Sequence, residues 1–87
     1  MLTGKTESGF EFQLSENAMN NMELIEDLAT VDRGDVTALP KVLVALLGAE
    51  EKKRLYDHLR TEDGRVPIDL LVEEVKQMFK VSKELKN

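Results

Sequence analysis

The sequence predicts an α+β domain that is mostly α, with an N-terminal β-strand or hairpin packed on about four helices. Apolar residues alternate with polar ones near the N-terminus and then recur at three- and four-residue steps through the rest of the chain. The length supports the same conclusion, because 87 residues fit one domain, 1–87, and leave no room for two.

The first fourteen residues have the pattern of β structure. Phe10, Phe12 and Leu14 alternate with polar residues, so a strand here places three apolar groups on one face. Residues 1–3 are expected to pair with this strand across the polar stretch 4–8. Because an isolated two-stranded hairpin is marginal in water, it must lie on the helices that follow.

Two helices are expected next. Ser15 is the predicted N-cap of the first helix, which should end before the polar stretch that begins at Asp32. The predicted apolar face of this helix consists of Ala18, Met22, Ile25, Leu28 and Ala29. Pro40 suits the first turn of a second, short helix, and Gly48 is placed to end it. The apolar stripe of this short helix is Leu39, Val42, Leu43 and Leu46.

A third helix should begin with Glu50 and Glu51, where the helix dipole favours negative charge, and should close before Gly64. Pro67 then opens a long final helix. The apolar residues of that helix are Ile68, Leu71, Val72, Val75, Met78, Phe79 and Leu85. We expect one core to join Phe10 and Phe12 to Leu43, Leu46, Leu55, Leu59, Leu71 and Val75.

Residues suited to catalysis or metal binding are few. There is no cysteine, and His58 is the single histidine, so thiolate and two-histidine metal sites are excluded. A calcium loop around Gly64 would place Leu59 and Leu70 at ligand positions, and neither binds a hard cation. We expect His58 and the many carboxylates to lie on a solvated surface. The sequence therefore predicts no enzyme, no catalytic residue, no metal site and no cofactor.

The overall charge argues against two classes of partner. Seventeen acidic and twelve basic residues give a net charge of −5, the wrong sign for general attraction to nucleic acid or anionic lipid. The longest apolar run, Val42–Leu47, is far too short to cross a bilayer, and no secretory signal is expected at the N-terminus. A cytoplasmic protein without a membrane partner is the expectation.

Two alternatives stay open, an adaptor from an unrelated assembly and a small helix-turn-helix DNA-binding regulator. Residues 39–60 give two helices joined at a glycine, and the second carries Lys52, Lys53 and Arg54. The same helix also carries Glu50, Glu51 and Asp57, which favours a helical corner within the core instead.

Taken in order, several segments give a more specific indication. They are Ser8-Gly9-Phe10-Glu11-Phe12, Asn21-Met22-Glu23-Leu24, Ala38-Leu39-Pro40-Lys41-Val42, Leu46-Leu47-Gly48, Leu55-Tyr56-Asp57-His58-Leu59-Arg60 and Glu62-Asp63-Gly64-Arg65-Val66-Pro67. This succession, which spans nearly the whole chain, resembles the tail assembly chaperones of long-tailed phages and prophages of Gram-positive bacteria.

The resemblance implies a non-enzymatic chaperone that binds the phage tape measure protein while the tail tube assembles, with the major tail protein as a further partner. It also implies a protein of the host cytoplasm that is absent from the mature virion. For the partner-binding surface we select Met78, Phe79, Val81 and Leu85. These side chains span more than one face of the final helix, so they cannot all be buried in one small core.

Overall fold

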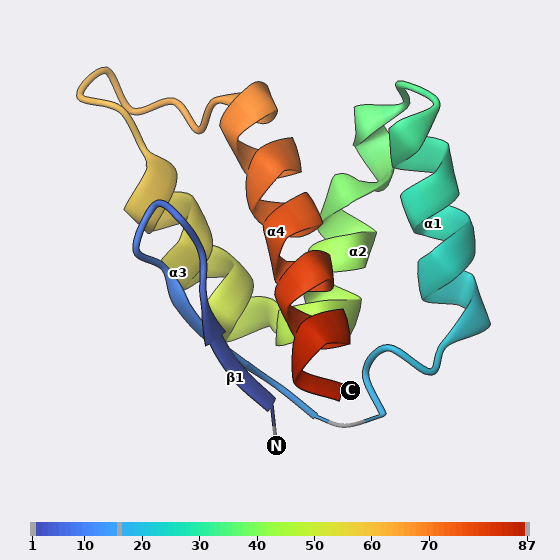
Figure 1. The fold of residues 1–87 in the computed structure, drawn as a ribbon. Coiled ribbons are helices and arrows are strands. Elements are labelled where there is room, and N and C mark those ends of the chain that lie inside the picture. Colours follow the sequence, from blue (N-terminus) through green and yellow to red (C-terminus); the bar gives the residue numbers. More distant parts are fainter. Residues whose placement is uncertain (1, 16, 87) are drawn as a thin grey trace.

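The computed structural model describes residues 2–15 and 17–86, with side chains described as far as residue 82. Within these residues, an antiparallel hairpin precedes four α-helices and a short 3-10 helix (Figure 1), which confirms the predicted α+β, mostly α class. The strands are β1 (Leu2–Lys5) and β2 (Glu11–Leu14). The helices are α1 (Met22–Asp32), η1 (Val36–Ala38), α2 (Leu39–Leu47), α3 (Ala49–Leu59) and α4 (Ile68–Lys86).

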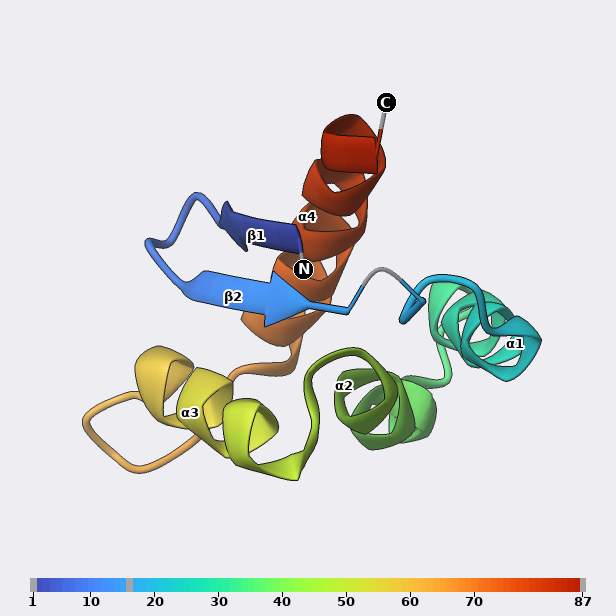
Figure 2. The same cartoon turned by 90° about the horizontal axis from the view of Figure 1, so that it is seen from below.

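The hairpin forms much as the alternating pattern predicts. Phe10, Phe12 and Leu14 are all buried, and Leu14 lies opposite Leu2 in the register of the two strands. β1 extends to Lys5, so Gly4 and Lys5 belong to the strand rather than to the turn as predicted. The hairpin crosses α4 on its β1 side and reaches α2 through β2 (Figure 2), so it closes one side of the helical core.

The predicted start of the first helix is wrong. α1 begins at Met22 instead of after Ser15, because the side chain of Asn21 accepts hydrogen bonds from the backbone N–H groups of Glu23 and Leu24. The predicted apolar face is also shifted. Leu24 is the buried residue of α1, whereas Met22 is 67% exposed and Ile25 is 43% exposed.

The second and third helices agree closely with their predicted boundaries. The apolar stripe of α2 is buried, and Gly48 ends the helix with a φ of 86°, a positive value that residues with a side chain adopt only with strain. The backbone N–H of Gly48 donates to the carbonyl oxygen of Val44, and α3 begins at the next residue. Leu55 is fully buried in α3, while Leu59 packs at the edge of the core.

The core lies between the hairpin and the helices. Its buried side chains are Phe10, Phe12, Leu14, Leu24, Leu39, Val42, Leu43, Leu46, Leu55, Leu71, Val75 and Met78. The eight predicted core residues belong to this cluster or, in the case of Leu59, pack against it. Ile68 does not join the buried stripe of α4 because it is 56% exposed in the first turn of the helix. No helix in the described part of the chain is both long enough and apolar enough to cross a membrane.

Candidate partner-binding groove

The four residues selected as a partner-binding surface do not lie on one surface. Met78 is completely buried, so its side chain belongs to the core and is not available to a partner. Val81 is half-buried against β1: a Cβ placed on Gly4 would lie 2.7 Å from Val81 Cγ1. The side chain of Leu85 lies outside the described residues. Phe79 lines the groove between α1 and α4, whereas Val81 lines a separate, smaller cavity beside β1.

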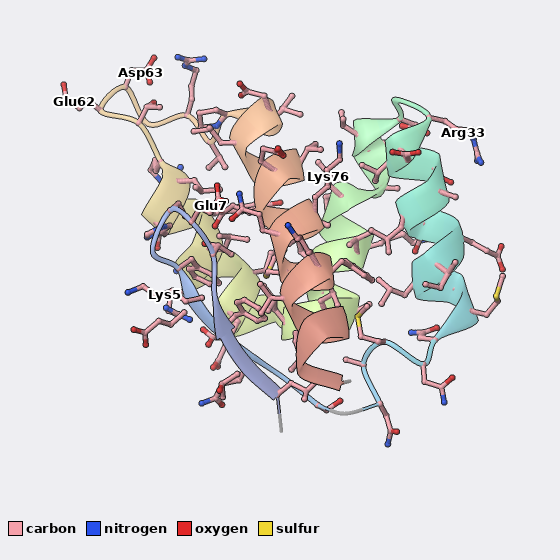
Figure 3. The ribbon with its side chains drawn as sticks, viewed as in Figure 1. Lys5, Glu7, Arg33, Glu62, Asp63 and Lys76 are labelled. Carbon is pink, nitrogen blue, oxygen red and sulfur yellow. The ribbon has the colours of Figure 1, made fainter. Side chains whose placement is uncertain are left out.

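The groove that Phe79 lines is apolar and has a volume of about 580 Å³. From α1 it is lined by Ile25, Leu28, Ala29, Val31 and Asp32, and from α4 by Val72, Val75, Lys76 and Phe79. The two helices run in opposite directions on either side of it (Figure 1), and Lys76 extends from α4 at its edge (Figure 3). The groove exists because α1 packs on α2 and η1, which leaves its other side facing α4 across an open space.

Both walls of the groove have the same spacing. Positions 25, 28, 29 and 32 of α1 and positions 72, 75, 76 and 79 of α4 are each related as i, i+3, i+4 and i+7. Side chains at this spacing form one stripe along a helix. At 1.5 Å per residue each stripe is roughly 10 Å long, about two helical turns. The groove therefore presents two largely apolar stripes, each with one charged residue, Asp32 on α1 and Lys76 on α4.

A polar cluster on another side of α4 holds the hairpin in place. Glu74 is only 3% exposed, and its Oε1 atom accepts hydrogen bonds of 2.8 Å from the hydroxyl groups of both Thr6 and Ser8. The carboxylates were expected on a solvated surface, so this burial is a correction. The burial could have been anticipated from spacing, since position 74 lies three residues after Leu71 and four before Met78, on the buried face of α4.

His58 completes this cluster at the surface. Its Nε2 atom lies 3.1 Å from Ser8 Oγ and 3.2 Å from the Ser8 carbonyl oxygen, and its ring packs on Phe10 with centroids 5.5 Å apart. Since a carbonyl oxygen only accepts, Nε2 carries the hydrogen and donates it. The histidine is therefore not arranged as a base for the Ser8 hydroxyl, whose proton goes to Glu74. The cluster is a structural clamp between the hairpin, α3 and α4.

The basic side chains of α3 are partly engaged within the molecule. Arg54 pairs with Glu51 at 2.7 Å, stacks on the Phe10 ring at 4.3 Å and donates to the Glu11 carbonyl oxygen. The hydrogen bond with Arg54 lowers the pKa of Glu51, and the same bond raises the pKa of Arg54. Lys52 lies over the ring of Tyr56 at 5.4 Å. Two of the three basic residues of this helix are thus held by intramolecular contacts.

The described side chains include no group of three or more histidine, aspartate or glutamate residues placed to hold a metal ion. The groove itself was missed by sequence reasoning, although most of its α1 residues were assigned to one apolar face. That face was expected to enter the core, whereas the face that includes Leu24 packs on α2 and leaves Ile25, Leu28 and Ala29 toward the groove. Comparison with protein-family models, curated proteins and solved structures finds no match to this chain.

Proposed function

We propose that this protein is a non-enzymatic phage tail assembly chaperone that binds the tape measure protein and aids tail tube assembly. The observation that carries the proposal is the α1–α4 groove, with two apolar stripes of matching spacing and an open side. The resemblance of the ordered segments along the chain supplies the identity of the client. In this proposal the protein acts in the host cytoplasm, has the major tail protein as a further partner and does not enter the mature virion.

The groove suits a helical segment of the client. A helix that lies between α1 and α4 packs its own i, i+3, i+4 and i+7 residues against both stripes at once. Binding would cover apolar side chains of the client that otherwise promote aggregation. The net charge of −5 on the chaperone would help to keep the resulting complex in solution.

Co-purification with the tape measure protein that we expect to be encoded beside this chain tests the proposal. In the variant Ile25→Lys/Phe79→Lys, each wall of the groove carries a lysine in place of an apolar side chain. We expect this variant to lose most of its bound client, because binding would bury two uncompensated charges. Val44→Lys is the matched control, since Val44 is an exposed apolar residue of α2 that does not line the groove.

Circular dichroism of both variants establishes that they keep the wild-type helical content. Equal recovery of the client by the wild type, the control and the groove variant would remove the groove from the proposal. Failure of the wild type to retain the tape measure protein, together with salt-sensitive binding of duplex DNA, would favour the helix-turn-helix alternative.

A further inference from the structure

We propose that a second copy of this chain fills the α1–α4 groove when no client is bound, so that the protein is a two-fold symmetric dimer. Each copy would place its α1 in the groove of the other. The inference goes beyond the proposed function, because it concerns the protein alone and does not depend on the identity of the client.

The first observation is an exposed apolar ridge directly beside the groove. Met22, Ile25 and Ala29, the α1 ridge, lie at i, i+3 and i+7 and are all exposed. Ile25 and Ala29 also line the groove, so ridge and groove form one continuous apolar surface. A two-fold interface uses the same patch on both subunits and therefore has to be complementary to itself. A ridge next to a groove of similar length meets this requirement.

The direction of the helices determines which two-fold axis is suitable. α1 and α4 run in opposite directions (Figure 1). An axis parallel to the helices carries the α1 ridge of one copy into the groove of the other and keeps the two α1 helices parallel. The inserted α1 is then antiparallel to the α4 helix that it contacts. An axis perpendicular to the helices would place ridge on ridge and leave both grooves empty.

The second, independent observation is the order of charges along the two helices. The exposed charged residues of α1 are Glu23 and Glu26 near its N-terminus and Asp32 at its end, where it lines the groove, and Arg33 follows just after the helix. On α4 the exposed order is acidic and then basic, with Asp69 and Glu73 before Lys76 and Lys80. Because the two helices are antiparallel, the acidic start of α1 lies level with the basic part of α4.

In the proposed dimer this arrangement produces attraction at the end of the groove where Lys76 and Lys80 lie. Glu23 and Glu26 of each copy face Lys76 and Lys80 of the other, and Arg33 lies level with the acidic end of the facing α4. Glu23 and Glu26 lie on the edge of α1 that points away from the groove of their own copy. Their pairs with Lys76 and Lys80 therefore form only between copies. Opposite charges at matched positions select this register over a shifted one.

The interface is small, so the dimer should be weak and exchangeable. We expect each copy to bury about 600 Å², which is at the lower limit for specific association. This area is roughly a tenth of the 5692 Å² surface of one chain. We expect a dissociation constant in the micromolar range, of order 10 μM. A client helix that uses the same groove would displace the second copy, and the exposed apolar surface would be covered in both states.

Sedimentation equilibrium of the full chain with two charge-reversed variants tests the proposal. One variant is Glu23→Lys/Glu26→Lys and the other is Lys76→Glu/Lys80→Glu. Each variant alone should dimerise more weakly than the wild type, with a dissociation constant raised by about tenfold or more, because like charges then face each other. An equimolar mixture should regain the wild-type affinity, since both contacts of the mixed dimer again join opposite charges. Met22→Lys removes apolar area from the ridge and should weaken the dimer in any partner combination.

Wild-type protein that stays monomeric at about 200 μM would overturn the inference, since that is well above the expected dissociation constant. Dimers of either charge variant as stable as the wild type, or a mixture that stays monomeric, would also overturn it. Equal thermal unfolding of all variants at low concentration excludes misfolding as the cause. The proposed function is tested separately: a monomer that still captures the tape measure protein disproves only the dimer, and a dimer that captures none disproves only the chaperone.

Discussion

Gly4 controls how closely β1 approaches α4. A Cβ at this position would lie 2.7 Å from both Phe12 Cζ and Val81 Cγ1, well inside van der Waals contact. The ring of Phe12 is buried and the Val81 methyl group is on a stiff β-branched side chain, so neither can move away easily. Gly4 is therefore required by packing and not by its backbone conformation.

Replacing Gly4 with alanine should lower the free energy of unfolding by about 1–3 kcal/mol, the usual effect of overpacking a core. Urea denaturation measures this loss. The double variant Gly4→Ala/Val81→Ala should lose less than the sum of its two single variants, because removal of the valine methyl groups makes room for the new one. If the losses of the two single variants simply add in the double variant, β1 does not pack against Val81.

The second residue-scale prediction concerns Thr6, which is buried in the clamp. Its hydroxyl donates to Glu74 and accepts from the backbone N–H of Phe10 at 3.2 Å. Thr6→Val keeps the shape of the side chain but removes these hydrogen bonds and the 3.1 Å hydroxyl contact with Ser8, so the Phe10 N–H loses its side-chain acceptor and the buried Glu74 keeps only Ser8 as a donor. We expect a loss of about 1–3 kcal/mol in denaturant unfolding. Thr37→Val, at an exposed threonine of η1, is the control; an equal loss in the two variants would contradict a special role for the buried clamp.

At the scale of elements, α1 is the helix most dependent on its cap. Leu24 is its single fully buried residue, and its contacts go mainly to α2 and η1. The Asn21 side chain satisfies two backbone N–H groups of the first turn. A helix with so little buried surface gains a large share of its stability from such local hydrogen bonds.

Asn21→Ala should therefore destabilise the protein by about 0.5–2 kcal/mol. Asn21→Asp, which keeps an acceptor oxygen at the cap, should retain most of the wild-type stability. Hydrogen exchange of the α1 amides provides the local measurement, since loss of the cap should speed exchange in the first turn before it affects α2. Unchanged exchange in the alanine variant would mean that packing alone fixes the start of α1.

For the whole molecule, the shifted carboxylates predict how stability depends on pH. The Arg54 side chain lowers the pKa of Glu51, and hydroxyl hydrogen bonds from neighbouring threonines lower the pKa of Asp35 and Asp63. A lowered folded-state pKa means that the folded chain binds fewer protons than the unfolded chain. The resulting stability is complete above the ordinary values, 4.5 for Glu51 and 3.8 for the two aspartates, and disappears as the pH falls through the lowered ones.

Urea unfolding between about pH 6 and pH 3 should thus show a free energy of unfolding that begins to fall near pH 4.5. Glu51→Gln should make this decline shallower, because one of the shifted groups is then absent. Added salt should have a similar effect, since these exposed groups are screened. A free energy of unfolding that rises as the pH drops through this range would contradict the assignment.

Local patterns in the sequence determined much of the fold. The alternation around Phe12 predicts β2 and its buried face, and the stripe from Leu39 to Leu46 predicts α2 with its end at Gly48. These features depend on neighbours within a few positions along the chain, through strand pleat, helical period and the freedom of glycine at positive φ. The absence of cysteine and the single histidine likewise restrict the available chemistry through composition alone.

The sequence pattern allows more than one apolar face of a helix to be buried, and only the tertiary structure decided which face is. Ser15 was predicted as the cap of the first helix, whereas Asn21 caps it, and Leu24 of α1 enters the core while Ile25 borders the groove. Met78 and Phe79 are adjacent and both apolar, yet one is buried and the other lines the groove. Glu74 finds its hydroxyl partners 66 and 68 positions away along the chain. Such outcomes depend on contacts between distant segments, and a local pattern does not contain them because it shows that a face is apolar without showing what covers it.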